Sequence, residues 1–146
     1  MEILIRKPSI TYKIFILFDN ELIDYDAIKN NKKFLEEWIK DLKKNLNRQY
    51  KIVFDKLESL KECRGKTKKL IGTIKVGNLE IDLFSDRVNR DIRIIFSTIK
   101  GTNIIIVWGI DHHEKAYREI IRHAEGFIRN HQGKILELLR IKMIHR

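Results

Sequence analysis

The feature that most constrains the fold is an almost continuously apolar run of seven residues, Ile104–Ile110 (IIIVWGI). A membrane-spanning helix needs about 18 or more such residues, and no stretch of the chain reaches that length. Short runs rich in β-branched residues are typical of a central strand that is covered on both faces. The turn-forming segment Lys100–Asn103 precedes the run. The sequence therefore predicts a buried strand at 104–110 that follows a tight turn.

Further strands are predicted near 10–18, 70–76, 79–84 and 91–99. The first of these segments (ITYKIFILF) is rich in β-branched and aromatic residues, and glycines separate the others. The connection 100–103 is too short for a parallel crossover, so the strands 91–99 and 104–110 are predicted to be antiparallel. The strand 91–99 is expected to lie between the strands 79–84 and 104–110.

Apolar residues at helical spacing predict the helices. The stripe of the first helix begins at Leu35 and ends at Leu46, so this helix is expected to start near Asp26 and to end near 45–47. A shorter helix follows through 50–60. Asp111 and Glu114 have the spacing of a capping box, which predicts that a long helix begins there.

These elements predict an α+β fold with an antiparallel sheet of about four strands, two N-terminal helices and a C-terminal helix, the helices covering one face. The chain contains one proline and no Gly/Ser-rich linker. We therefore expect a single domain over 1–146, with 132–146 as a C-terminal helical extension.

The charge balance points to a polyanionic partner. The chain carries 30 Lys and Arg against 20 Asp and Glu, a net charge of +10. Nucleic acid is the commonest polyanion, and an acidic protein or an anionic membrane are the alternatives. Cys63 is the only cysteine, which excludes an intrachain disulfide and a cysteine-based zinc site. The histidines lack metal-ligand spacing, so no metal or other cofactor is expected, and the protein is expected in the cytoplasm.

Basic residues concentrate between the second helix and the strand 91–99. Residues 61–100 carry ten basic and five acidic side chains. Such residues could bind phosphates. Alternatively, they could form a solvated loop and a sheet edge that lysines protect from strand addition. Six of these ten basic residues form the candidate phosphate-binding set: Arg64, Lys66, Lys68, Lys69, Arg87 and Arg90.

Arg93 is a candidate catalytic residue because it interrupts an apolar strand. Ile92, Ile94 and Phe96 alternate with it and so point to the opposite face. A guanidinium in this position needs solvent or an anion. It could bind a scissile phosphate, or it could form a structural ion pair with Asp91, Glu80 or Asp82.

His113 and Tyr117 are four residues apart and therefore share one face of the predicted helix. Near a helix N-terminus, where an anion is favoured, an imidazole and a phenol could both transfer protons. Alternatively, both residues have structural roles only: His113 stands at the helix N-terminus and Tyr117 packs on the sheet.

The segment from Leu60 to Arg118 resembles the RelE/ParE toxin superfamily. Asp91–Phe96 (DIRIIF) is similar to its "yRliy" strand, and Ile104–Arg118 (IIIVWGIDHHEKAYR) is similar to its "vvllgvgHhdeaYr" ending. Leu60–Lys66 (LKECRGK) looks like the family's passage from a helix into the sheet.

The resemblance implies the toxin of a toxin–antitoxin pair, a metal-independent endoribonuclease that cuts mRNA on the ribosome and binds a cognate antitoxin. Arg93 would stabilise the transition state, while His113 and Tyr117 would act as acid or base or stack on bases. The basic set named above, with Arg118, would contact the RNA. The residues 132–146 would pack as an extra helix or form a homodimer. The alternatives are a non-catalytic nucleic-acid-binding protein and a ParE-like topoisomerase inhibitor.

Overall fold

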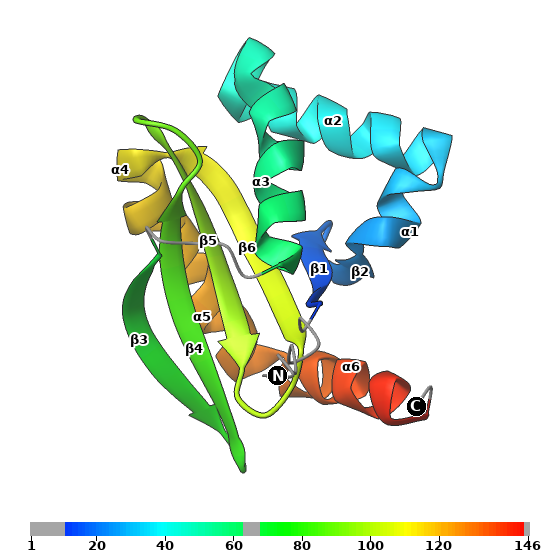
Figure 1. The fold of residues 1–146 in the computed structure, drawn as a ribbon. Coiled ribbons are helices and arrows are strands. Elements are labelled where there is room, and N and C mark those ends of the chain that lie inside the picture. The colour runs from blue at the N-terminus through cyan, green and yellow to red at the C-terminus, as the bar shows by residue number, and fades with distance from the viewer. Residues whose placement is uncertain (1–10, 63–67, 145–146) are drawn as a thin grey trace, which may run out of the picture.

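The computed structural model describes residues 11–62 and 68–144, the last four of them as backbone only. It has an α+β fold (Figure 1). The strands are β1 (Lys13–Phe18), β2 (Glu21–Asp24), β3 (Lys69–Val76), β4 (Leu79–Arg87), β5 (Ile92–Ile99) and β6 (Ile104–His112). The helices are α1 (Tyr25–Lys29), α2 (Lys32–Leu46), α3 (Lys51–Lys61), α4 (His113–Lys115), α5 (Ile121–Asn130) and α6 (Gln132–Ile144). A 3₁₀ turn (Asn47–Tyr50) joins α2 to α3, and a π-helical segment (Ala116–Ile120) joins α4 to α5.

The strands form one six-stranded mixed sheet in the order β2-β1-β6-β5-β4-β3. β1 runs parallel to β6, whereas the other neighbouring pairs are antiparallel. The predicted antiparallel sheet of about four strands is therefore wrong in strand number and in the direction of β1. The predicted neighbours of β5 are confirmed, because β5 lies between β4 and β6 and is antiparallel to both.

Helices cover both faces of the sheet, which corrects the expectation of one covered face. On one face, α1, α2 and α3 pack on alternate residues of β1, β5 and β6, among them Ile94 and Val107. On the other face, α5 and α6 pack on residues such as Ile95 and Ile106. Both faces of β6 are buried, as its continuous apolar run predicts. Figure 1 shows the two helical layers on opposite sides of the strands.

The β1–β2 hairpin and the break between α1 and α2 are not among the predicted elements. Asp19 and Asn20 form the turn, with φ values of 52° and 59°. Two successive residues with positive φ are characteristic of a type I′ turn, for which Asp and Asn are among the favoured residues. Asn31 then caps α2, its side chain accepting a hydrogen bond from the Phe34 N–H at 3.0 Å. The single helix predicted from Asp26 is therefore a short helix, a break and a long helix.

The predicted capping box at Asp111–Glu114 is also wrong. β6 continues to His112, and the first helical residue is His113. The Asp111 carboxylate accepts a hydrogen bond from the adjacent His112 N–H at 2.7 Å, so the carboxylate does not reach the first helical turn. The His113 N–H instead donates to the Asp91 carbonyl at 2.8 Å, which fixes the start of α4 against the β4–β5 turn.

Candidate active site

Two rows of cross-strand partners place polar and charged residues at one end of the sheet. Arg87 on β4, Arg93 on β5 and Asp111 on β6 lie in register with one another. In the adjacent row, Lys69 on β3 lies in register with Ser85 on β4. Directly opposed residues project to the same face of a sheet. Both rows therefore belong to the face that α5 covers, at the end where α4 begins.

Arg93 is 8% exposed and is held by the backbone of the β4–β5 turn. Its Nη1 donates to the carbonyl oxygens of Asn89, Arg90 and Ile92, at 3.0, 3.1 and 3.2 Å. Its Nε and Nη2 make no hydrogen bond to any residue that the structure describes. One side of the guanidinium is thus anchored, and the other side keeps donors for an additional acceptor.

The structural ion pair considered for Arg93 is absent from the described part of the chain. Each of the three candidate carboxylates has a different partner. Asp91 pairs with His112 at 3.0 Å, Glu80 pairs with Lys100 at 3.4 Å, and Asp82 accepts from the Thr73 hydroxyl at 2.7 Å. Register partners with like charge, such as Arg87 and Arg93, repel each other. An anion between them would remove that repulsion.

His113 and Tyr117 lie on one helical face, as their spacing predicts. Their ring centroids are 4.7 Å apart, and the rings meet edge to face at 79°. Tyr117 belongs to the π-helical segment, a feature that often occurs at functional sites. This segment lies close to β6, because a Cβ atom at Gly109 would come within 2.9 Å of the Ile120 side chain.

A cavity of about 260 Å³ brings these rows and this helix start together. Its lining residues are Lys69, Ser85, Asp86, Arg87, Arg93, His113 and Tyr117. All three predicted catalytic residues are in this set, together with two of the predicted RNA-binding residues, Lys69 and Arg87. Seven residues from β3, β4, β5, α4 and the π-helical segment therefore line one small space.

Ser85 and Asp86 line the same cavity but are not among the residues predicted from the sequence. Ser85 is 2% exposed, and its hydroxyl has no hydrogen-bond partner among the described residues. Asp86 accepts from the Arg87 N–H at 2.8 Å and forms an ion pair of 2.7 Å with Lys56 on α3. The position of Ser85 opposite Lys69 was the only signal that could have found it, and it requires the strand register, which the sequence does not reveal.

The other predicted RNA-binding residues do not line this cavity. Arg64 and Lys66 lie outside the described residues. The Lys68 ammonium lies 5.2 Å from the ring centroid of Phe84, a residue of the face that α3 covers. Arg90 is exposed in the β4–β5 turn, where its carbonyl accepts from Arg93.

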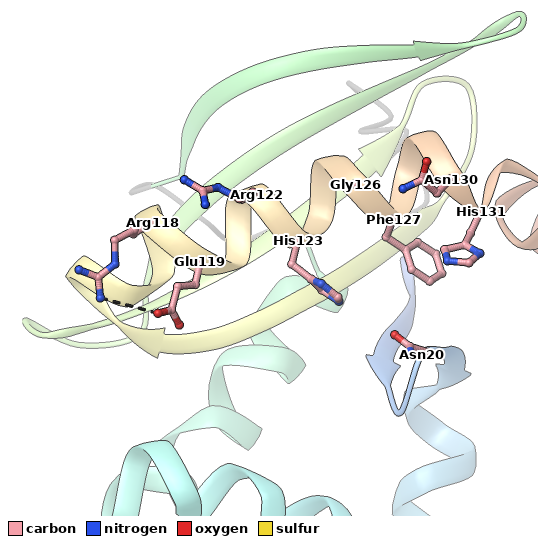
Figure 2. A pocket seen from close by; sticks show the side chains of 9 residues that line it. All are labelled: Asn20, Arg118, Glu119, Arg122, His123, Gly126, Phe127, Asn130 and His131. Carbon is pink, nitrogen blue, oxygen red and sulfur yellow. Dashed lines mark ion pairs between the residues drawn. The ribbon is translucent and has the colours of Figure 1, made fainter.

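Arg118 lies in a separate groove of about 620 Å³ along α5 (Figure 2). The residues that line this groove are Asn20, Arg118, Glu119, Arg122, His123, Gly126, Phe127, Asn130 and His131. Arg118 pairs with Glu119 at 3.7 Å, an exposed contact that contributes little to stability. Arg118 follows Tyr117 in sequence but belongs to a different surface.

The electrostatics of the cavity favour an anion. Lys69, Arg87 and Arg93 contribute three positive charges, and none of them forms an ion pair with a described residue. Asp86 is the one acidic lining residue, and Lys56 offsets its charge. A phosphodiester in this cavity would meet guanidinium donors beside an imidazole and a phenol. Within residues 11–62 and 68–144 there is no group of three or more His, Cys, Asp or Glu side chains arranged to hold a metal ion.

None of the helices in the described ranges is long and apolar enough to cross a membrane.

Comparison with known proteins gives no relative: no family model, no curated protein and no solved structure matches the chain.

Proposed function

We propose that the protein is an endoribonuclease that cuts mRNA on the ribosome, the toxin of a toxin–antitoxin pair. The observation that carries the proposal is the meeting of Arg93, His113 and Tyr117 in one cationic cavity. The free guanidinium donors of Arg93 suit a phosphoryl group whose charge grows in the transition state. The adjacent imidazole and phenol suit the two proton transfers that cleavage requires.

The reaction uses the 2′-hydroxyl of the substrate as its nucleophile. The 2′-oxygen forms a bond to phosphorus while the bond from phosphorus to the 5′-oxygen breaks. A base accepts the 2′ proton, an acid donates a proton to the 5′-oxygen, and a 2′,3′-cyclic phosphate and a 5′-hydroxyl result. His113 and Tyr117 supply these proton transfers, Arg93 stabilises the phosphoryl charge, and Lys69 and Arg87 hold phosphates.

The choice of partners follows from charge and from the sequence resemblance. A net charge of +10 favours a polyanion. The resemblance to the RelE/ParE superfamily supports the ribosome as the place of cleavage and an antitoxin as the protein partner. Translation takes place in the cytoplasm, so the protein would act there.

The test is induction of the protein without an antitoxin. We expect growth to stop because translation stops, and we expect new mRNA ends that carry cyclic phosphates. A substrate with a 2′-deoxynucleotide at the cleavage site should remain intact, since it lacks the nucleophile. Normal growth with accumulation of folded protein would refute the proposal. RNA binding without cleavage would favour a non-catalytic binding protein, and DNA damage would favour a topoisomerase inhibitor.

A further inference from the structure

The corner between α2 and α3 carries a second cationic cavity. It has a volume of about 720 Å³, and its lining residues are Lys43, Asn47, Arg48, Tyr50 and Lys51. Three of these five side chains are positively charged, and none is acidic. Asn47, with φ of 51°, ends α2 and turns the chain into the 3₁₀ turn that carries Arg48 and Tyr50. The turn thus gathers charges from two helices.

The three cations of this corner are accessible to a ligand. Lys43, Arg48 and Lys51 are exposed, and none of them forms an ion pair with a described residue. The Lys43 ammonium lies 5.0 Å from the ring centroid of Tyr50, which is half-buried. Cations that surround an aromatic ring are the combination with which proteins bind single-stranded nucleic acid: the cations contact phosphates and the ring stacks on a base.

A continuous set of hydrogen bonds joins this corner to the candidate active site. The side chain of Asn89, in the β4–β5 turn, donates to the Gln49 Oε1 atom at 2.9 Å. The carbonyl of the same Asn89 accepts from Arg93 Nη1 at 3.0 Å. Asn89 therefore contacts Arg93 of the candidate active site and Gln49, which lies between Arg48 and Tyr50 in the 3₁₀ turn, and the exposed Arg90 follows Asn89. In Figure 1, α4, the β4–β5 turn and the α2–α3 corner all lie at the same end of the molecule.

We infer that the α2–α3 corner is a second subsite for single-stranded RNA, which holds a nucleotide on one side of the phosphate that Arg93 contacts. The RNA strand passes from the Arg93 cavity over the β4–β5 turn to Tyr50. The ring of Tyr50 stacks on a base, and Lys43, Arg48 and Lys51 contact phosphates. This assignment rests on the proposed function, because it extends the binding site of the same substrate.

The test measures binding of a fluorescent 2′-O-methyl oligoribonucleotide of about ten nucleotides, which the proposed reaction cannot cleave. The variant Lys43→Gln/Arg48→Gln/Lys51→Gln removes the corner charges. The matched control Lys32→Gln/Lys33→Gln/Arg140→Gln removes three exposed charges elsewhere, so its net charge is equal. Removing one phosphate-binding cation lowers the slope of log affinity against log salt by about 0.7 for a single strand. We expect the magnitude of this negative slope to decrease by about two units for the corner variant, which makes the salt dependence shallower, and to stay almost unchanged for the control.

Two variants of Tyr50 test the stacking interaction. Loss of one stacked base typically weakens binding roughly 5- to 150-fold, and we expect Tyr50→Ala to do so. Tyr50→Phe keeps the ring and should bind almost as tightly as the natural protein. Thermal melts of all variants would identify any that fail to fold, and Tyr50→Phe then provides the comparison. Equal affinity for Tyr50→Ala and Tyr50→Phe would overturn the stacking role.

Failure of this inference differs from failure of the proposed function. If the protein cleaves RNA but the corner and control variants bind with the same salt slope, the corner is no subsite. If the corner variants weaken binding but no RNA is cleaved, the corner binds nucleic acid and the endonuclease proposal fails.

Discussion

Arg93 and Asp111 are register partners on β5 and β6, yet they form no ion pair. Arg93 donates to three carbonyls of the β4–β5 turn, while the Asp111 carboxylate accepts from the His112 N–H. Asp111 lines a different cavity, with Trp38 and His123 among its residues. Two opposite charges that are both less than 10% exposed are therefore held apart. This separation leaves guanidinium donors free in the candidate active site.

The carbonyl contacts predict that Arg93 also stabilises the fold. Removal of hydrogen bonds to a charged group typically costs roughly 2–3 kcal/mol, so Arg93→Ala should lower the Tm by roughly 5–10 °C. Arg87→Ala, a change at an exposed position in the same cavity, should shift the Tm by less than about 2 °C. Calorimetric melts check both values. An Arg93→Ala protein as stable as the natural one would show that the carbonyl contacts contribute little.

The role of Arg93 in cleavage is best tested with Arg93→Lys, because this variant keeps the charge. A lysine cannot present the planar fork of a guanidinium. We expect cleavage to fall by about 10²-fold while RNA affinity changes little. Single-turnover rates and binding curves on one protein sample separate the two effects. Unchanged cleavage would exclude the catalytic role that we propose for Arg93.

Tyr117→Phe isolates the phenol hydroxyl. The substituted ring keeps the edge-to-face contact with His113, whose centroid lies 4.7 Å away, so the Tm should not change measurably. If the hydroxyl transfers a proton, the single-turnover rate should fall by roughly 10²- to 10⁴-fold. A rate equal to that of the natural protein would leave base stacking as the only role for Tyr117.

Much of the candidate site could be predicted from the sequence because helical and strand periodicities are local. The four-residue spacing of His113 and Tyr117 placed both on one face, and the alternation around Arg93 placed it opposite Ile94. Register between strands depends on long-range pairing, so Ser85 could not be assigned to the site. Lys68 and Lys69 illustrate the same limit: Lys68 immediately precedes β3, and one residue along an extended chain reverses the face.

The β1–β2 hairpin and the pairing of β1 with β6 could not be predicted from local sequence patterns. The β1–β2 hairpin requires positive φ at Asp19 and Asn20, residues that equally suit an irregular loop. The parallel pairing of β1 with β6 connects segments about 90 residues apart in sequence. No local pattern encodes that pairing, whereas the short 100–103 turn imposes the antiparallel pairing of β5 with β6.

Gly109→Ala should disturb the π-helical segment that carries Tyr117. The new Cβ would lie 2.9, 3.0 and 3.2 Å from three side-chain carbons of Ile120, so the Ile120 side chain or the segment that carries it must move. Overpacking of this kind typically costs about 1–3 kcal/mol. The double variant Gly109→Ala/Ile120→Ala should lose less stability than the sum of the two single variants. Additive losses in urea denaturation would show that the close approach is not a constraint.

Ionisation of Tyr25 should lower the stability of the folded protein at alkaline pH. Burial raises the pKa of Tyr25 to about 12, and its hydroxyl has no hydrogen-bond partner among the described residues. In the unfolded chain the tyrosine pKa is about 10. The folded state therefore binds the proton more tightly, and the stabilisation is complete below pH of about 10 and is lost as the pH rises towards about 12. Tyr25→Phe should be as stable as the natural protein at neutral pH and relatively more stable at high pH. A stability difference that stays constant across this range would contradict the prediction.

Lys68 and Lys69 should behave differently, although the sequence gives them equal weight as RNA contacts. Lys69 lines the candidate active site, opposite Ser85 in the β3–β4 ladder, whereas the Lys68 ammonium lies over Phe84 on the face that α3 covers. Both variants, Lys69→Ala and Lys68→Ala, lose one positive charge, so a difference between them reflects position. We expect Lys69→Ala to lower the cleavage rate and to reduce the salt slope of RNA binding by about 0.7. Lys68→Ala should cleave at the natural rate, with a slightly lower Tm because a cation–π contact is worth about 0.5–1 kcal/mol at an exposed site. Equal effects of the two substitutions on cleavage would show that general charge, and not the geometry of the Arg93 cavity, governs RNA recognition.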